Sequence, residues 1–224
     1  MYPNLAAVAA LIGDPARAAM LFALLDGRES PATQLALSGN ASPQAASGHL
    51  KKLVDGGLLE VRSCGRQRLY KLASSDVARA IETLASIAPA QPPNSLRSHS
   101  TLERLREARS CYDHLAGRLG VAVTQALCKR KQLALRGEEF ALTRSGEEFL
   151  RDVGVDVSAA RDAKRAFARV CLDWTERTPH LAGSLGAALL ETFLAEGWVK
   201  RAAHDRSLQI TERGKTQIKR LFAV

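Results

Sequence analysis

A twelve-residue stretch, SPQAASGHLKKL at 42–53, decides the fold of the first part of the chain. Ser42 can cap a helix, and Pro43 suits the first helical position because the N–H that proline lacks has no partner there. Ala46, Leu50 and Leu53 then recur at helical spacing and form one apolar face. The stretch therefore predicts an amphipathic helix, which a pair of glycines brings to an end.

The flanking sequence predicts the other elements of a winged helix-turn-helix. Leu58–Val61 and Arg68–Leu72 alternate in polarity around a turn at 63–66, which is typical of a β-hairpin. Apolar residues at helical spacing, with capping residues before them, predict the remaining helices. These helices are expected at Leu5–Ile12, from Asp14-Pro15 to Leu25, from Ser30-Pro31 onward and at Ser74–Ile87.

The residues off the apolar face of the central helix suit contact with DNA. They are small, polar or basic: Gln44, Ala45, Ser47, Gly48, Lys51 and Lys52. Glutamine can make two hydrogen bonds to adenine, and lysine suits phosphates. The hairpin adds Arg62, Arg66, Gln67 and Arg68, which can contact the backbone or the minor groove. The sequence therefore predicts that this helix lies in the major groove of duplex DNA.

The distribution of charge agrees with a polyanionic partner. The chain carries a net charge of +9, and residues 40–72 contain six basic and two acidic residues. A basic stretch of this kind favours nucleic acid. The alternative is an ordinary solvated helix and hairpin, because each residue taken singly is common on a protein surface.

The motif in 42–53, with Gly57-Leu58-Leu59 and the segment 65–72, resembles the DNA-reading core of the ArsR/SmtB repressors over about residues 5–88. The resemblance adds Ser42 and His49 to the expected DNA-binding residues. It implies a homodimer on an inverted-repeat operator, and repression that an effector relieves. The apolar residues expected at the two-fold contact are Leu5, Val8, Leu11, Ile81 and Leu84.

The resemblance does not extend to the metal sites of that family. The paired cysteines that many members carry before the recognition helix are replaced by Thr33-Gln34-Leu35-Ala36-Leu37. The helix expected at 74–87 contains Asp76 but no histidine. Neither familiar metal site can therefore be assigned to this chain.

A proline-rich segment, PAQPPNS at 89–95, divides the chain. Such a segment cannot continue a helix and has little to bury. The expected organisation is a DNA-binding and dimerisation domain at 1–90, a linker at 91–100, and a second domain at 101–224.

The second domain contains a diverged internal repeat. Cys111-Tyr112-Asp113 is echoed by Cys171-Leu172-Asp173, and the His-Leu-Ala-Gly of 114–117 by that of 180–183. Further on, each copy carries a Thr-x-x-Gly that begins a last helix. The expected fold is therefore mainly α-helical with small β-hairpin wings (α+β), in which a pair of winged-helix-like units follows the N-terminal winged helix-turn-helix.

The repeat supplies the candidate effector site. Cys111 and His114 share a face if 110–119 is helical, and Cys171 and His180 are their counterparts. Thiols and imidazoles can hold zinc or copper(I), and a thiol can act as a redox switch. Trp174 can line a small-molecule pocket. The alternative is that these residues have only a structural role and pack in the hydrophobic core.

No hydrolase, P-loop or dinucleotide-binding motif occurs, so an enzyme is not expected. No apolar run reaches the ~18 residues of a membrane helix, and a cytoplasmic location is expected. The sequence predicts a sequence-specific DNA-binding repressor that needs no cofactor to bind DNA, with an unidentified effector. The alternatives are a constitutive or architectural DNA-binding protein, and a metal or thiol-redox sensor.

Overall fold

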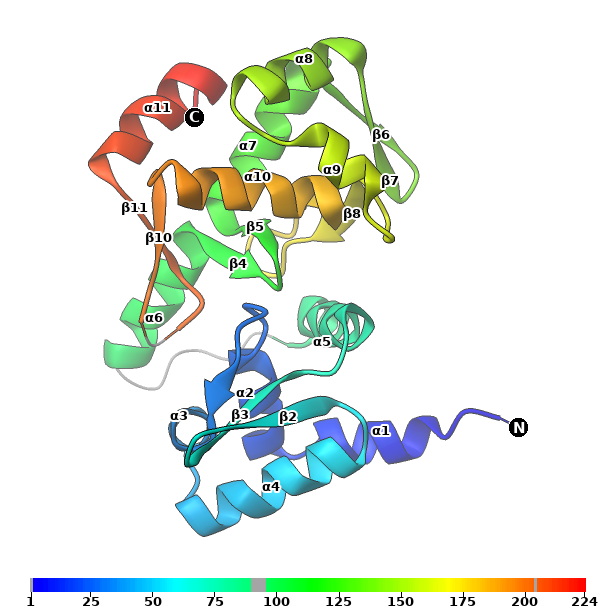
Figure 1. Cartoon of the computed structure of the whole chain (residues 1–224), viewed down its shortest axis with the longest axis vertical. Coiled ribbons are helices and arrows are strands. Elements are labelled where there is room, and N and C mark those ends of the chain that lie inside the picture. Colours follow the sequence, from blue (N-terminus) through cyan, green and yellow to red (C-terminus); the bar gives the residue numbers. More distant parts are fainter. Residues whose placement is uncertain (1, 90–95, 204) are drawn as a thin grey trace. The chain divides into compact units, whose positions relative to one another are not determined.

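The protein consists of two compact units, Met1–Leu84 and Ala85–Val224, each described by itself below (Figure 1). The structure is a computed structural model that describes residues 2–89, 96–203 and 205–224. Both units mix helices with small antiparallel sheets, which confirms the predicted fold class. Contacts within the chain divide it between Leu84 and Ala85. The domain limits expected from the sequence, 1–90 and 101–224, stay predictions.

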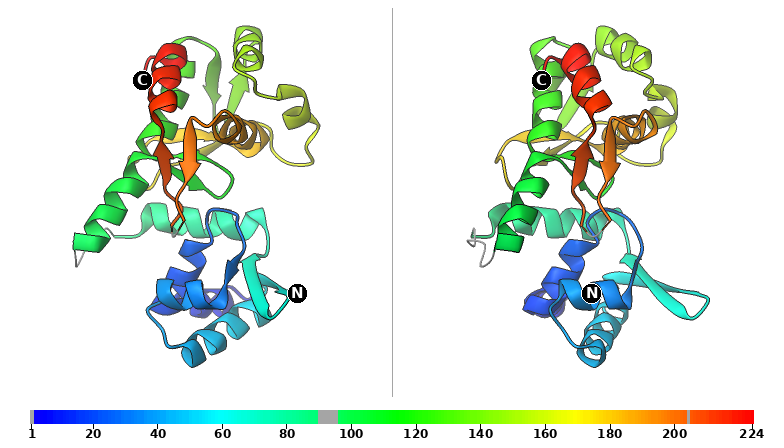
Figure 2. Two further views of the ribbon diagram at one scale, coloured as in Figure 1. Left: turned by 60° about the vertical axis from the view of Figure 1, so that its left-hand side comes forward. Right: turned by 90° about the vertical axis from the view of Figure 1, so that its left-hand side faces the viewer.

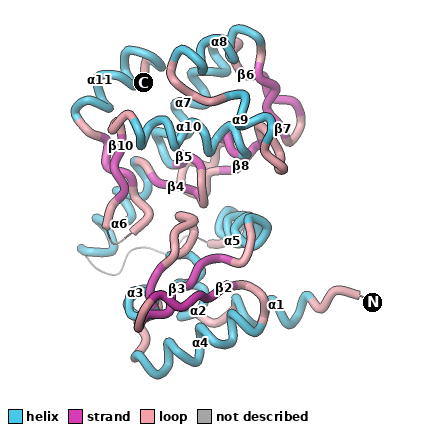
Figure 3. Tube along the Cα trace, viewed as in Figure 1, coloured by secondary structure: helices cyan, strands magenta, loops and turns pink. Residues whose placement is uncertain are grey.

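The first unit is a winged helix-turn-helix in which helices surround a three-stranded sheet of order β1-β3-β2 (Figure 3). Its helices are α1 (Leu5–Ile12), α2 (Pro15–Ala23), α3 (Ala32–Ser38), α4 (Pro43–Asp55) and α5 (Ser75–Ile87). Its strands are β1 (Ser30–Pro31), β2 (Leu59–Cys64) and β3 (Gln67–Leu72). Helix α5 begins in this unit and ends just beyond its limit.

Side-chain caps fix where α2 and α4 begin. Asp14 accepts a hydrogen bond from the backbone N–H of Arg17 at 2.9 Å, and Ser42 accepts one from that of Ala45 at 3.3 Å. The core between the helices is aliphatic, as the sequence pattern predicts. Its most deeply buried residues are Met20, Leu21, Leu24, Leu25, Leu35, Leu50 and Leu53.

One element of the first unit was not expected. The sequence predicted that Ser30-Pro31 begins a helix, whereas these residues form β1 and pair with Tyr70 and Leu69 of the wing. Pro31 has an extended backbone conformation (φ −72°, ψ 154°) and precedes the helix, so α3 begins at Ala32.

The second unit contains two copies of one arrangement, a hairpin and helix followed by a second hairpin and helix. After α6 (Leu96–Glu107), the first copy comprises β4 (Arg109–Cys111), β5 (His114–Ala116), α7 (Gly117–Lys129), β6 (Leu133–Arg136), β7 (Glu139–Leu142) and α8 (Arg144–Asp152). After α9 (Val157–Asp162), the second comprises β8 (Arg169–Leu172), β9 (Pro179–Ala182), α10 (Gly183–Ala195), β10 (Val199–Arg201), β11 (Leu208–Ile210) and α11 (Glu212–Phe222).

The two copies interlock. Helix α10 packs against β5 of the first copy, and α7 packs against β9 of the second (Figure 1). The backbone N–H of Leu181 in β9 donates to the hydroxyl of Thr124 in α7 at 3.0 Å. Strands β8 and β9 extend the β6–β7 hairpin into one four-stranded sheet, and β4 bridges to the segment before β11. Each copy therefore completes the other, and one apolar core runs through both.

The Thr-x-x-Gly motif has the same role in both copies. Thr143 and Thr211 accept hydrogen bonds from the backbone N–H of Gly146 and Gly214, at 3.1 and 2.9 Å, and so cap α8 and α11. A Cβ at Gly214 would lie 2.0 Å from the carbonyl oxygen of Trp198. The glycine is therefore required for α11 to approach the residue before β10 this closely.

One sequence-based expectation for the second unit needs correction. Where a helix was considered over 110–119, the chain forms the β4–β5 hairpin, and α7 begins only at Gly117. Tyr112 has a positive φ (58°), which is incompatible with a helix that runs through this position. Of the predicted linker at 91–100, residues 91–95 lie outside the described residues, and the remainder is the first turn of α6.

Within the described ranges, no single helix has both the length and the apolar composition to cross a membrane; α1 and α2 pass that test only together, across an 86° bend.

Candidate functional site

The exposed face of α4 presents the side chains that the sequence predicted for DNA contact. Ala46, Leu50 and Leu53 are buried against the first unit, which leaves the opposite face to solvent. The exposed residues are Ser42, Gln44, Ala45, Ser47, Gly48, Lys51 and Lys52. Lys51 forms an ion pair with Asp55 one turn along the helix, at 2.6 Å. The N-terminal part of this exposed face, the front of the helix, thus carries small and polar residues, and the C-terminal part carries the two lysines.

His49 does not share this face. It is half-buried, with its Nδ1 3.5 Å from the Arg17 guanidinium and 3.7 Å from the Asp14 carboxylate, both of α2 and its cap. Arg17 also donates to the carbonyls of Ala10 and Leu11 at the end of α1. His49 therefore lies among the residues that hold α4, α2 and α1 together, although the sequence placed it in the DNA-binding set.

The wing formed by β2 and β3 extends away from the helices of the first unit (Figure 2). Arg66, Gln67 and Arg68 at its tip are exposed. Arg62 differs, because its Nε donates to Glu29 at 2.6 Å. This hydrogen bond raises the pKa of Arg62 above its ordinary value and lowers the pKa of Glu29. The tip of the wing thus offers basic side chains, whereas Arg62, opposite Leu69 within the hairpin, is held by Glu29.

The helices expected at a two-fold contact carry exposed apolar residues. None of the residues of α1 is buried, and Leu5 and Val8 are 77% and 37% exposed. On α5, Leu84 is 43% exposed, whereas Ile81 is buried at 6%. Ile81 is therefore part of the packing within the chain rather than of a free surface.

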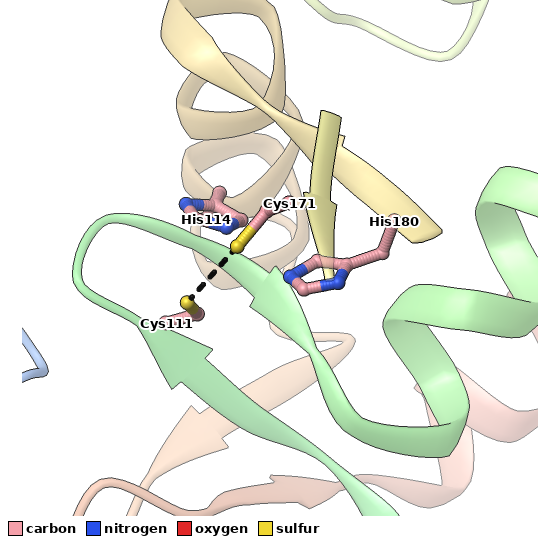
Figure 4. Close-up of side chains that lie close together, drawn as sticks. All are labelled: Cys111, His114, Cys171 and His180. Carbon is pink, nitrogen blue, oxygen red and sulfur yellow. Dashed lines mark hydrogen bonds between the residues drawn. The ribbon is translucent and has the colours of Figure 1, made fainter. Parts of the chain in front are cut away.

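Four side chains of the duplicated hairpins converge in the second unit. Cys111 and His114 face each other across β4–β5, and Cys171 and His180 occupy the same register in β8–β9. The two sulfur atoms are 3.8 Å apart, and one ligand atom from each residue lies within 4.8 Å of the others (Figure 4). Cys111, His114 and His180 are buried, and Cys171 is half-buried. The structure thus joins four of the five predicted effector-site residues.

The two imidazoles of this Cys/His cluster (Cys111, His114, Cys171 and His180) are stacked at 5.1 Å. Burial opposes protonation of His114, but the Cys111 sulfur and the Asp113 carboxylate outweigh it and raise the pKa of His114 to about 9. Nδ1 of His114 lies 3.4 Å from Asp113, and Nδ1 of His180 lies 4.0 Å from Asp173. Within the described part of the chain, Nε2 of His114 and both ring nitrogens of His180 have no hydrogen-bond partner.

A buried ion pair lies beside the cluster. Arg109 of β4 and Asp173, which follows β8, are both fully buried, with 2.9 Å between guanidinium and carboxylate. Asp173 also accepts from the backbone N–H of Gly117 at 2.7 Å, so it caps α7 of the other copy. Burial alone would raise the pKa of Asp173, but Arg109 and these hydrogen bonds hold it well below its ordinary value. Trp174, the fifth predicted residue, lies under the Arg109 guanidinium at 4.6 Å, outside the set of four.

Sequence reasoning missed Arg109 as a functional neighbour. Arginine and aspartate are almost never fully buried unless they are paired. The sequence of β4, Arg-Ser-Cys, gives no sign that Arg109 is buried. The partner, Asp173, lies 64 residues away and was not identifiable from spacing.

The chain is similar in sequence to a known transcriptional regulator. No protein-family model matches the sequence. The uncharacterized HTH-type transcriptional regulator YdfF of Bacillus subtilis (strain 168) is 43% identical over 215 residues, which are 96% of this chain and 95% of YdfF. Reduced HlyU from Vibrio cholerae is 27% identical, with a TM-score of 0.35 and coverage of 38% of this chain and 88% of HlyU. A homodimeric winged helix-turn-helix DNA-binding domain from Mycobacterium bovis, described as a possible ArsR-family regulator, is 27% identical, with a TM-score of 0.28 and coverage of 38% and 83%.

The fold of the first unit and the exposed face of α4 define a class, the transcriptional regulators with a DNA-binding winged helix. The similarity to YdfF extends this class over almost the whole length of the chain. The chain belongs to the HTH-type transcriptional regulators. Its motif in 42–53 resembles the DNA-reading core of the ArsR/SmtB repressors.

Replacing Asp173 with Asn should strongly destabilise the second unit. Removing one partner of a buried ion pair leaves the other charge uncompensated, at a cost of ~3–5 kcal/mol. Glu196→Gln, which removes the exposed pair between Glu196 and Arg213, should change the free energy of unfolding by less than ~1 kcal/mol. Chemical denaturation measures both. Equal changes in the free energy of unfolding for the two variants would show that the buried pair between Arg109 and Asp173 does not stabilise the second unit more than an exposed pair does.

Proposed function

We propose that the protein is a sequence-specific DNA-binding repressor that binds an inverted-repeat operator as a homodimer and leaves it when the second unit binds an effector. The observation that carries the DNA-binding part is the exposed front of α4, where Gln44, Ala45, Ser47 and Gly48 lie opposite the buried apolar face. The resemblance to ArsR/SmtB repressors supports repression and its release.

The chemistry of α4 fits the major groove. Gln44 can donate to and accept from one adenine edge, and Ser47 can reach a base or a phosphate. A Cβ added at Gly48 would meet nothing within 4 Å, so this position leaves room for close approach. Lys51 and Lys52 lie farther along the helix, where phosphates would lie.

The wing supplies contacts that carry little sequence information. Arg66, Gln67 and Arg68 suit the phosphate backbone or the minor groove. Arg62 contributes in another way, because its bond to Glu29 ties the wing to the segment before α3. We also infer that His49 supports the position of α4 instead of contacting DNA.

Dimerisation accounts for the uncovered apolar residues of α1. A single recognition helix reads few base pairs, and a two-fold dimer presents two, about one helical turn apart. A helix with Leu5 and Val8 exposed and no buried residue suits an isologous contact.

The proposed division of labour assigns DNA binding and dimerisation to about residues 1–90 and sensing to 101–224. The similarity to a transcriptional regulator favours a non-enzymatic protein that acts on DNA in the cytoplasm. A constitutive architectural protein is the competing candidate, and it would bind all duplexes with similar affinity.

Gln44→Ala and Ser47→Ala should each weaken binding to the preferred duplex by ~1–3 kcal/mol and relax preference at particular base pairs. The duplex would be selected by the wild-type protein from a random library, and affinities measured by fluorescence anisotropy. Gln209→Ala, at an exposed glutamine of β11, is the matched control. Unchanged ratios of specific to random binding in both α4 variants would exclude α4 as the reader.

Arg66→Ala with Arg68→Ala should weaken binding to every duplex. The slope of log affinity against log salt should fall by about one for each phosphate that the variant no longer neutralises. Arg220→Ala, at an exposed arginine of α11, should leave the slope unchanged. A slope that stays at the wild-type value would remove the wing from the interface.

Leu5→Glu with Val8→Glu should convert a dimer into a monomer, because two charges would be buried at the two-fold contact. Light scattering at micromolar concentration gives the mass. Leu135→Glu changes a leucine on β6 that is 54% exposed, and should leave the mass unaltered. A wild-type protein with the mass of one chain would contradict the proposed dimer.

A further inference from the structure

We propose that Cys111, His114, Cys171 and His180 bind one zinc ion in a tetrahedral site of the second unit. This inference concerns metal binding by the chain itself, and it holds or fails whether or not the proposed repressor function is correct. Four observations carry it: the spacing of the ligand atoms, the types of donor, the unsatisfied imidazole nitrogens and the carboxylates behind them.

The spacing of the sulfur atoms already suits a metal. Two thiolates at ~2.3 Å from a tetrahedral ion are about 3.8 Å apart. The Cys111 and Cys171 sulfurs are separated by 3.8 Å, and the four ligand atoms all lie within 4.8 Å of one another. A disulfide would instead require the sulfurs to close to ~2.05 Å. A metal therefore fits with less movement of the two hairpins than a disulfide.

The donor set favours zinc among the common metals. Two thiolates and two imidazoles in tetrahedral arrangement are a usual zinc ligand set. All four positions come from protein side chains that are buried or half-buried. Such a closed set leaves no position for water or substrate, so the ion would stabilise structure instead of catalysing a reaction.

The imidazoles lack the partners that buried polar groups normally have. His180 is fully buried, and neither of its ring nitrogens has a hydrogen-bond partner among the described residues; the same holds for Nε2 of His114. More than about nine in ten buried polar groups are satisfied in folded proteins, so each exception calls for an explanation such as an ion. Packing alone explains a buried cysteine but leaves these nitrogens unsatisfied.

Carboxylates lie behind both imidazoles. Asp113 is 3.4 Å from Nδ1 of His114, and Asp173 is 4.0 Å from Nδ1 of His180. Metal-binding histidines usually donate their other N–H to a carboxylate, which orients the ring. The contact between Nδ1 of His114 and Asp113 leaves Nε2 of His114 for the metal. His180 makes no hydrogen bond to Asp173 at 4.0 Å and can offer either nitrogen. Arg109 holds Asp173 in place through the buried ion pair.

The duplication sets the stoichiometry. Each copy contributes one cysteine and one histidine from directly opposite positions of its hairpin, so neither copy alone has a complete ligand set. The site therefore takes one ion per chain and links β4–β5 to β8–β9.

The test is a metal titration of the full-length protein, freed of metal by a chelator and kept reduced. Co²⁺ is the spectroscopic probe, because tetrahedral sulfur and nitrogen ligands give it visible bands. We expect saturation at one Co²⁺ per chain, displacement by Zn²⁺, and a higher Tm with Zn²⁺ than without metal. An absence of these bands, or no rise in Tm with Zn²⁺, would overturn the proposal without any variant.

Matched variants locate the site. Cys111→Ser and His180→Ala should abolish the bands, while Cys64→Ser and Cys128→Ser, at the two cysteines outside the cluster, should retain them. Asp113→Asn should weaken Zn²⁺ binding by about 10-fold or more, because this carboxylate, which also pairs with Arg165, orients His114 without binding the metal. Bands that survive Cys111→Ser with Cys171→Ser would contradict the proposed ligands.

The outcome is separable from the DNA-binding proposal. Zn²⁺ binding that leaves operator affinity unchanged supports the site and excludes zinc as the inducer. Failure to bind Zn²⁺ or Co²⁺ overturns the site, and the results for Gln44, Ser47 and the wing stand unaltered.

Discussion

The buried ion pair between Arg109 and Asp173 is the constraint on which the second unit depends. Two charges removed from water need each other and several hydrogen bonds to compensate for the loss of hydration. Asp173 obtains them from Arg109, from the first residue of α7 and from the turn that follows β8. The pair thereby fixes the two hairpins of different copies side by side, and this positions the Cys/His cluster between them.

The first unit depends on a simpler division, between the buried and exposed faces of one helix. The buried leucines of α4 pack against α2 and α3, and His49 adds a polar contact to Asp14 and Arg17. Because these contacts occupy one face fully, the other can carry small and polar residues at little cost to stability. The same helix thus packs with one set of side chains and leaves another set available for the proposed contact with DNA.

Local patterns predicted much of this fold. Caps and apolar spacing gave α2 and α4 nearly to the residue, and turn residues gave the wing and the duplicated units. Contacts between distant segments were not predictable: the pairing of Ser30-Pro31 with β3 and the ion pair of Arg109 with Asp173. The local hairpin at Cys111–His114 was not predicted either. The cysteines and histidines were identified from the repeat, but a helix was assumed where strands bring them together, since no local signal marks the positive φ at Tyr112.

The interlocking of the two copies has a consequence for how the chain folds. Helix α7 packs against a strand of the second copy and α10 against a strand of the first, in addition to strands of their own copies, so each copy alone buries only part of its helix. The residues that meet are far apart in sequence, as Cys111 and Cys171 are at 60 positions. Such a topology has a high contact order, so the transition state must close long loops before it gains packing energy. The second unit should therefore fold as one slow cooperative step, with neither copy stable as an intermediate.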